Sequence, residues 1–144
     1  MENTSTLISA SCIFCKIADG TVPTPFLYED EHTVAFLDMN QNIPGHTLVV
    51  PKKHTVNIFD TDDETLARSM ATVRLVAPAV RDAVGAHGVH IDSNHGAAAG
   101  QVVFHLHFHI IPRHDRSEFS FPVPTDNPPG NTDILIQKIR SALA

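Results

Sequence analysis

The stretch FHLHFHII, residues 104–111, alternates apolar residues with histidine. In a β-strand, alternate side chains share a face and lie roughly 7 Å apart along it. A strand here would carry three imidazoles on one face, from His105, His107 and His109. The opposite face would be apolar and would pack on a helix; it comprises Val102, Phe104, Leu106, Phe108 and Ile110. Because buried imidazoles need hydrogen-bond partners, the histidine face is not expected to be an ordinary core surface.

Further strands and one long helix are predicted around this stretch. The strand-like segments are PFLYED, HTVAFLDM, HTLVVPKKH and HGVHIDSNH, with VVFHLHFHIIPRH as the fifth and longest. The pattern Thr61-x-x-Glu64 is typical of a capping box that opens a helix, and Gly85 can end that helix. Its apolar face would consist of Leu66, Met70, Val73, Ala77, Val80 and Val84. The segment CIFCKIADG predicts a short helix closed by Gly20.

These elements predict an α+β fold with an antiparallel five-stranded sheet, one long helix and short terminal helices, because the strands pair largely in sequence around one inserted helix. A chain of 144 residues suits one hydrophobic core. We expect residues 1–11 to form a flexible N-terminal tail and residues 12–144 to form a single domain. Within it, the Pro-rich segment 114–131 would be irregular and 132–143 would form a C-terminal helix.

The charge balance excludes some classes of partner. Lys and Arg number 10 against 16 Asp and Glu, which gives a net charge of −6 with neutral histidine. Such a surface does not favour non-specific nucleic-acid binding, and an anionic substrate must be attracted locally. The start MENTSTLISAS has neither a basic region nor a long apolar run, so we expect no signal peptide and no membrane segment. The sequence therefore predicts a cytoplasmic protein.

Two cysteines are spaced as Cys12-x-x-Cys15. Without a secretory signal, a structural disulfide is not expected. A redox pair remains open, although no thioredoxin-like βαβ pattern surrounds the motif, and so does a role as two small core residues. We favour a zinc site. A closed zinc site has four ligands, so two histidines would complete it.

Three interpretations of the histidine stretch follow from the residues alone. A solvated polar strand face is the first, but such faces normally use Lys, Glu and Thr. A catalytic metal site is the second, although HLHFH offers none of the carboxylates that metallohydrolases commonly add. In the third, one imidazole is a nucleophile or proton carrier that its neighbours orient. A neutral imidazole attacks phosphorus and also leaves well, which allows a covalent intermediate.

The segment His105–Ile111 matches, at every position, the signature His-φ-His-φ-His-φ-φ, in which φ is apolar. With CIFCKIADGTVP, FLYEDEHTVAFLDMN, PGHTLVVPKKH and NHGAAAGQVV, the sequence resembles the histidine triad (HIT) family over roughly residues 12–113. The resemblance implies a hydrolase or transferase that acts on the α-phosphate of nucleotides, such as a nucleoside phosphoramidase or dinucleoside polyphosphate hydrolase. It also implies a homodimer.

The resemblance further implies roles for individual residues. The middle histidine, His107, would be the nucleophile that carries the nucleotidyl group before water releases a nucleoside monophosphate. His109 would contact the phosphate on the leaving-group side, and Gln101 and Asn94 would lie at the phosphate. A metallohydrolase, or a nucleotide-binding regulatory module with little turnover, remains an alternative function.

Residues of the substrate pocket can be carried over in the same way. Asp38 would accept hydrogen bonds from the ribose hydroxyls, because a carboxylate has two oxygens for two neighbouring donors. Gly96 and Gly100 would let the backbone approach an anion. The purine pocket would be lined by Phe14, Phe36, Met39 and Ile17, with His46 near the triad. By residue type alone, the apolar members are core residues, the glycine loop is a simple turn and His46 is a turn residue.

In the zinc-bearing branch of the family, the cysteine pair is joined by the histidine of PKKH and by the first triad histidine. The implied ligands of a structural Zn2+ are thus Cys12, Cys15, His54 and His105. One departure concerns Val102, because some members place there a hydroxyl residue that touches the phosphate. It weakens the likeness to the phosphoramidate-hydrolase branch.

Overall fold

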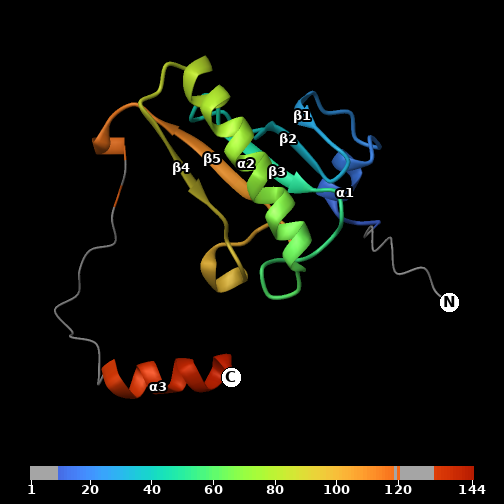
Figure 1. The fold of residues 1–144 in the computed structure, drawn as a ribbon. Helices are drawn as coiled ribbons and strands as arrows, with labels where there is room; N and C mark the ends of the chain where they lie inside the picture. Colours follow the sequence, from blue (N-terminus) through green and yellow to red (C-terminus); the bar gives the residue numbers. More distant parts are fainter. Residues whose placement is uncertain (1–9, 119, 121–131) are drawn as a thin grey trace.

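A computed structural model describes residues 10–118, 120 and 132–144. In this part of the chain, five antiparallel strands form one sheet in the order β1-β2-β3-β5-β4. Their bounds are β1 Phe26–Glu29, β2 Thr33–Leu37, β3 Thr47–Pro51, β4 Gly88–Asp92 and β5 Phe108–Arg113. As Figure 1 shows, β5, the last strand along the chain, lies inside the sheet between β3 and β4, and β4 forms the edge beside it. The predicted α+β architecture is confirmed.

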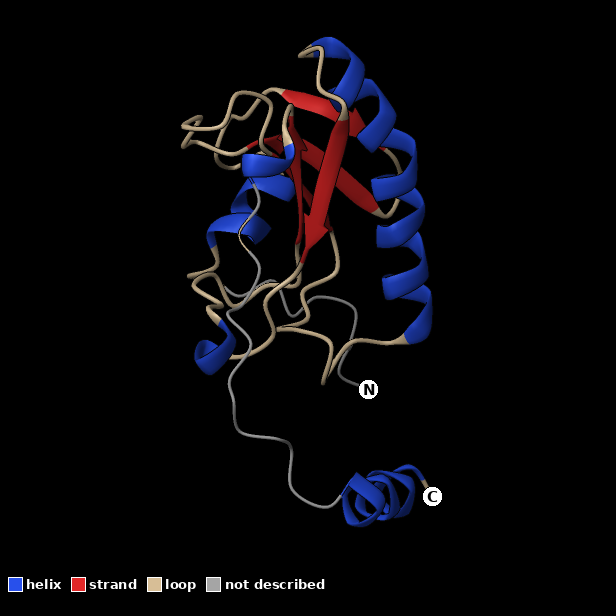
Figure 2. Ribbon diagram, turned by 90° about the vertical axis from the view of Figure 1, so that its left-hand side faces the viewer, coloured by secondary structure: helices blue, strands red, loops and turns tan. Residues whose placement is uncertain are grey.

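Within the described residues, three α-helices accompany the sheet: α1 (Ile13–Ala18), α2 (Asp63–Ala83) and α3 (Thr132–Leu143). The long helix α2 lies along one face of the sheet (Figure 2) and contacts β3, β5 and β2. On the opposite face, α1 contacts β3. Short 3-10 turns occur at Ala97–Ala99 and Arg116–Glu118. Among the described residues, none of the helices has the length and apolar character that crossing a membrane requires.

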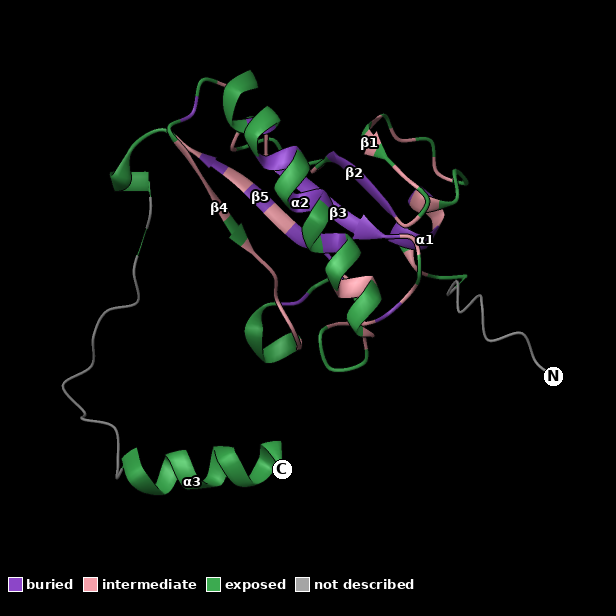
Figure 3. Ribbon diagram, viewed as in Figure 1, coloured by how far each residue is buried: buried purple, intermediate pink, exposed green. Residues whose placement is uncertain are grey.

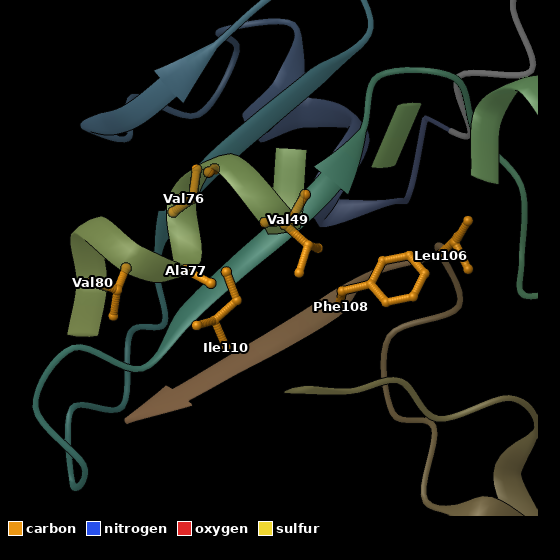
Figure 4. Close-up of a cluster of buried hydrophobic side chains, with 9 residues drawn as sticks. Val49, Val76, Ala77, Val80, Leu106, Phe108 and Ile110 are labelled. Carbon is orange, nitrogen blue, oxygen red and sulfur yellow. The ribbon is translucent and has the colours of Figure 1, made fainter. Parts of the chain in front are cut away.

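Two apolar clusters occupy the two faces of the sheet, because alternate strand residues point to opposite sides. Ala35 and Val49 face α2, whereas Val34, Phe36 and Val50 face α1. Figure 4 shows the α2 side, where side chains of the helix meet those of β3, of β5 and of the segment just before β5: Val49, Val76, Ala77, Val80, Leu106, Phe108 and Ile110. Each face of the sheet is therefore covered by a helix through its own apolar cluster, the larger one under α2 and the smaller one under α1.

The last strand is shorter than the sequence predicts. It begins at Phe108, and residues 103–105 bend before it. Val102 is 84% exposed and Phe104 is 49% exposed, so neither belongs to the apolar face that packs on α2. The backbone N–H of Leu106 donates to the carbonyl of Thr55 at 2.8 Å, a hydrogen bond outside the regular sheet. The prediction for Leu106, Phe108 and Ile110 is confirmed, because they lie in the α2 core.

The start and the buried stripe of α2 also differ from the prediction. Asp62 caps the helix, since its side chain accepts from the backbone N–H of Thr65 at 2.8 Å. The predicted Thr61–Glu64 capping box is therefore wrong. The helix turns Met70 outward, 41% exposed, and buries Ser69, Thr72, Val73, Val76, Ala77 and Val80. The buried hydroxyl of Thr72 is satisfied by a 2.6 Å hydrogen bond to the hydroxyl of Thr33 on β2.

Helix α3 differs from the other two helices, because all twelve of its residues are exposed along its whole length (Figure 3). Its exposed large apolar residues are Ile134, Leu135, Ile136, Ile139 and Leu143. By contrast, β3 is buried throughout and β5 is buried at alternate residues. The predicted irregular segment 114–131 lies mostly outside the described residues.

Candidate functional site

A cluster of four metal-ligating side chains joins α1 to the segment before β5. Cys12 caps α1, Cys15 lies within it, His54 follows β3, and His105 precedes β5. One ligand atom from each lies within 4.8 Å of all the others. The Nδ1 atoms of His54 and His105 are 3.1 Å apart. The chain folds so that residues 93 positions apart, Cys12 and His105, bring sulfur and nitrogen to 3.4 Å.

These distances fit a tetrahedral zinc ion. Zn–N bonds of about 2.0–2.1 Å and Zn–S bonds of about 2.3 Å separate neighbouring ligand atoms by about 3.3–3.8 Å. The Sγ of Cys15 lies 3.3 Å from Nδ1 of His54 and 3.5 Å from Nδ1 of His105. The Nε2–H of His105 donates to the carbonyl of Pro51 at 2.7 Å, which leaves Nδ1 as the ligand atom. Burial lowers the pKa of His105 to about 4, so the imidazole is neutral, as a ligand must be.

His107 is held in one orientation by the backbone. Its Nδ1–H donates to the carbonyl oxygen of His105 at 2.6 Å. The neutral ring therefore carries its free electron pair on Nε2. The ring of Phe14 packs edge-on against it, with centroids 5.0 Å apart. Burial is the largest cause that lowers the pKa of His107, so this imidazole stays unprotonated near neutral pH.

His109 forms a polar group with residues from two other strand ends. Its Nδ1 lies 2.9 Å from Nε2 of His46, which precedes β3. Nε2 of His46 is also 4.0 Å from a carboxylate oxygen of Asp38, which follows β2. Burial, followed by the positive charge of a protonated His107, lowers the pKa of His109. The residues that follow β2 and precede β3 thus meet the beginning of β5.

The glycine loop after β4 is held by its own hydrogen bonds. Gly96 and Gly100 have φ of +100° and +91°, a region that favours glycine. The N–H groups of Gly96, Ala99, Gly100 and Gln101 donate within the loop. These amides are therefore not free to bind an anion. Asn94 is more open, since its amide nitrogen makes one long contact, 3.5 Å, with the carbonyl of Gly100.

Gln101, predicted at the phosphate, is buried and used structurally. Its Nε2 donates to the carbonyls of Val56 at 2.7 Å and Val103 at 3.1 Å. Its Oε1 accepts from the N–H of Gly96 at 2.8 Å and from the side chain of Asn57 at 3.2 Å. Both N–H bonds of the amide are occupied, so the side chain braces the loop and does not reach out of it.

The predicted purine pocket is brought together in part. Phe14, Ile17 and Phe36 lie in one buried cluster beside the triad. Met39 does not join them, because its side chain is 99% exposed beyond the end of β2. Strand β2 ends at Leu37, so Met39 lies in the following turn and not on the strand with Phe36.

Sequence reasoning missed two residues near His107. The hydroxyl of Ser93 donates to the carbonyl of His107 at 2.7 Å and fixes the backbone of the nucleophile candidate. Nδ1 of His95 accepts from the N–H of Ile58 at 2.9 Å, and the positive charge of its protonated form would lower the pKa of His107. Their position directly before the glycine loop, in DSNHG, was the available signal.

Comparison with known proteins agrees with this geometry. The model of the family described as "HIT domain" matches residues 19–116. The chain belongs to the HIT family. It is 45% identical to the protein hit of Bacillus subtilis over 108 residues, which cover 75% of this chain and 74% of that protein. It is 40% identical over 112 residues to adenylylsulfatase HINT3 of Arabidopsis thaliana, covering 78% and 57%.

A solved structure bears on the metal cluster of this HIT protein. The zinc-bound histidine triad family protein of Mycobacterium smegmatis is 38% identical, with a TM-score of 0.72 over 92% of this chain and 97% of that chain. With the cluster of Cys12, Cys15, His54 and His105, this likeness supports the zinc-bearing branch of the family. The family prediction is thus confirmed.

Proposed function

We propose that this HIT protein is a nucleotide hydrolase or transferase that attacks the α-phosphate of a purine nucleotide conjugate through a nucleotidyl-His107 intermediate. The observation that carries the proposal is the hydrogen bond from His107 Nδ1 to the carbonyl of His105. It places the free electron pair on Nε2, in a site where burial keeps the ring neutral. A fixed, neutral imidazole is the state in which histidine acts as a nucleophile.

In the first step, Nε2 of His107 forms a bond to the α-phosphorus while the bond from phosphorus to the leaving group breaks. The leaving group departs with the electron pair of that bond, and His109 can supply a proton to it. In the second step, water attacks the same phosphorus, His109 takes a proton from the water, and the phosphorus–Nε2 bond breaks. The products are a nucleoside monophosphate and the protonated leaving group.

The remaining groups would bind and orient the substrate. Asp38 would accept hydrogen bonds from the ribose hydroxyls, and Phe14, Ile17 and Phe36 would border the base. Asn94 offers the more open donor of the loop, and we assign Gln101 a positioning role, because its amide braces residues 56, 96 and 103. The net charge of −6 means that such local donors must attract the anionic substrate.

A zinc ion on Cys12, Cys15, His54 and His105 would be structural. All four tetrahedral positions would be filled by protein atoms, so no position remains for substrate or water. When bound, the ion would supply a rigid link between α1 and the catalytic segment. Phe14 lies on that helix and touches His107, so the link would position the ring that borders the nucleophile.

We also propose a homodimer. Strand β4 is at the edge of the sheet, and Ile91 on it is 41% exposed. On α2, Met70 and Leu75 are 41% and 55% exposed. An exposed edge strand favours pairing with another strand, and a second copy of the chain would supply one through two-fold symmetry. Sedimentation of the purified protein tests this; a monomer at all concentrations would contradict it.

Turnover of a panel of substrates identifies the leaving group that the enzyme accepts. Nucleoside phosphoramidates, dinucleoside polyphosphates and adenylyl sulfate represent nitrogen, phosphate and sulfate leaving groups. The third is included because one relative is named an adenylylsulfatase. Each shares an α-phosphate joined to a nucleoside, so all three would give the same nucleotidyl-histidine.

The variant His107→Ala tests the mechanism. We expect its kcat to fall by at least about 10⁴-fold, as for removal of a nucleophile, while binding of a nucleoside monophosphate persists. Rapid quenching of the wild-type protein with substrate, followed by peptide mass spectrometry, should find one nucleotidyl group on the peptide containing His107. His87→Gln, which changes an exposed histidine, is the matched control and should keep full activity. Substantial turnover by His107→Ala would refute the mechanism.

A further inference from the structure

A second group of metal-ligating side chains lies outside the cysteine cluster. It consists of Asp38, His46 and His109, whose ligand atoms all lie within 4.8 Å of one another. Asp38 directly follows β2, His46 directly precedes β3, and His109 is the second residue of β5; these three strands are neighbours in the sheet. None of them belongs to the Cys2His2 cluster, which is formed by Cys12, Cys15, His54 and His105, so an ion could occupy each group at the same time.

Two imidazoles and one carboxylate are a donor set that zinc and other late divalent transition metals prefer. The distance of 2.9 Å between His46 and His109 nitrogens now accommodates a shared proton. The distance of 4.0 Å from His46 to Asp38 exceeds a hydrogen bond. Ligand atoms around zinc would lie about 3.3 Å apart, so one ion would need the first distance to grow by about 0.4 Å and the second to shrink by about 0.7 Å.

Hydrogen bonds of the loop between β2 and β3 hold these ligands in place before any ion binds. The Nε2 of Gln41 donates to the carbonyls of Asp38 at 2.7 Å and His46 at 3.0 Å, which ties the two ligand residues together. Its Oε1 accepts from the N–H of Gly45 at 2.9 Å. The N–H of Asn40 donates to Oδ1 of Asp38 at 2.8 Å, which leaves Oδ2 facing His46. The side chains of His46 and Asp38 are only 18% and 23% exposed.

We propose that Asp38, His46 and His109 bind a divalent transition-metal ion such as Zn2+, and that this ion excludes nucleotide from the site. Three protein ligands leave one tetrahedral position open to water. The ion would bind the carboxylate of Asp38, which the proposed function assigns to the ribose hydroxyls, and the imidazole of His109, which it assigns to the phosphate. The exclusion therefore rests on the proposed function, whereas the metal site rests on the geometry alone. Nucleotide hydrolysis would be inhibited by free zinc.

Calorimetric titration of Zn2+ into protein already loaded with one equivalent tests the site. We expect one further equivalent in the wild-type protein. In a parallel titration with Co2+, the Cys2His2 cluster gives thiolate-to-cobalt charge-transfer absorption, whereas the second equivalent gives none because it has no sulfur ligand. Uptake of a single equivalent, or a sulfur signature for both, would overturn the proposal.

Variants test whether the second equivalent of metal binds at Asp38, His46 and His109. His46→Gln removes a ligand and should weaken binding of the second equivalent by more than about tenfold. Gln41→Ala removes the side chain that ties Asp38 to His46 and should weaken that binding by a smaller factor. His87→Gln should bind both equivalents as the wild-type does. Each variant should retain the first equivalent, which shows that it is folded. A second equivalent of unchanged affinity in His46→Gln would overturn the assignment.

Two further measurements separate this inference from the proposed function. The variant His107→Ala keeps all three ligands, so it should bind the second equivalent even though its turnover is lost. Saturating adenosine, which has ribose hydroxyls but no phosphate to chelate metal, should lower the affinity of the protein for the second equivalent of metal. An undiminished affinity in adenosine would overturn the exclusion. Failure of every substrate, with the second equivalent retained, would refute the proposed function and leave the metal site standing.

Discussion

Removal of zinc from the Cys2His2 cluster should lower the stability of the protein without unfolding it. The helix α1 has six residues, fewer than a helix needs to be stable alone in water. Its docking depends on Phe14 and Ile17, which are 7% and 6% exposed. Burial of each contributes about 1.5–3 kcal/mol. The larger α2 core involves neither residue, so the sheet and α2 should stay folded without the ion.

The size of the loss follows from ligand linkage. A ligand present at 1,000 times its Kd stabilises the folded state by about 4 kcal/mol. For a chain of 144 residues, about 1 kcal/mol shifts Tm by roughly 3–4 °C. Loss of the ion should therefore lower Tm by roughly 12–16 °C at this zinc concentration. Weaker binding gives a smaller shift, which varies with the logarithm of zinc concentration.

Differential scanning calorimetry with and without a zinc chelator measures this shift, and metal analysis gives the stoichiometry. The variant Cys15→Ser should have the lowered Tm in both conditions, because it lacks one of the four ligands. His87→Gln should behave as the wild-type. If chelation leaves Tm unchanged in protein that had carried one zinc, the reasoning that the ion stabilises the docking of α1 is wrong.

Two other predictions concern the nucleophile and the core. Because the proposed attack needs a neutral imidazole and burial lowers the pKa of His107, activity should be lost only as pH falls through a value below 6.5; a pH profile of kcat/KM with its acid limb at or above 6.5 would contradict this. Thr72→Val should cost about 1–3 kcal/mol in urea denaturation, because the 2.6 Å hydrogen bond to Thr33 is buried. The double variant with Thr33→Val should cost less than the sum of the single variants, and strict additivity would show that the two hydroxyls are not coupled.

Local patterns were sufficient for much of the fold and for the chemistry of the site. The alternation in TVAFL predicts Val34 and Phe36 on one face and Ala35 on the other, as the two clusters have them. The period of two is a property of the strand itself, so it is visible in the sequence. The triad signature likewise defined the family, because its histidines and apolar residues are adjacent in the chain.

The rotation of α2 and the start of β5 were decided by tertiary contacts. Small hydroxyl residues fit against the sheet when a partner such as Thr33 satisfies them, so Thr72 is buried and the larger Met70 is turned outward. The pattern of apolar residues alone could not show that partner. Similarly, the contact from Leu106 to Thr55 keeps residues before Phe108 out of the ladder, although their alternation is that of a strand.

The sequence by itself determined which chemical groups the protein has: two thiols three positions apart, a run of alternating imidazoles, and the residues that resemble those of one family. Only the tertiary structure decided which of these groups meet. It places His105 beside Cys12 across 93 positions and His109 beside His46 across 63. Strand order and register fix such pairings, and both result from packing of the whole sheet. The three histidines, equivalent in the sequence, consequently have three different sets of neighbours.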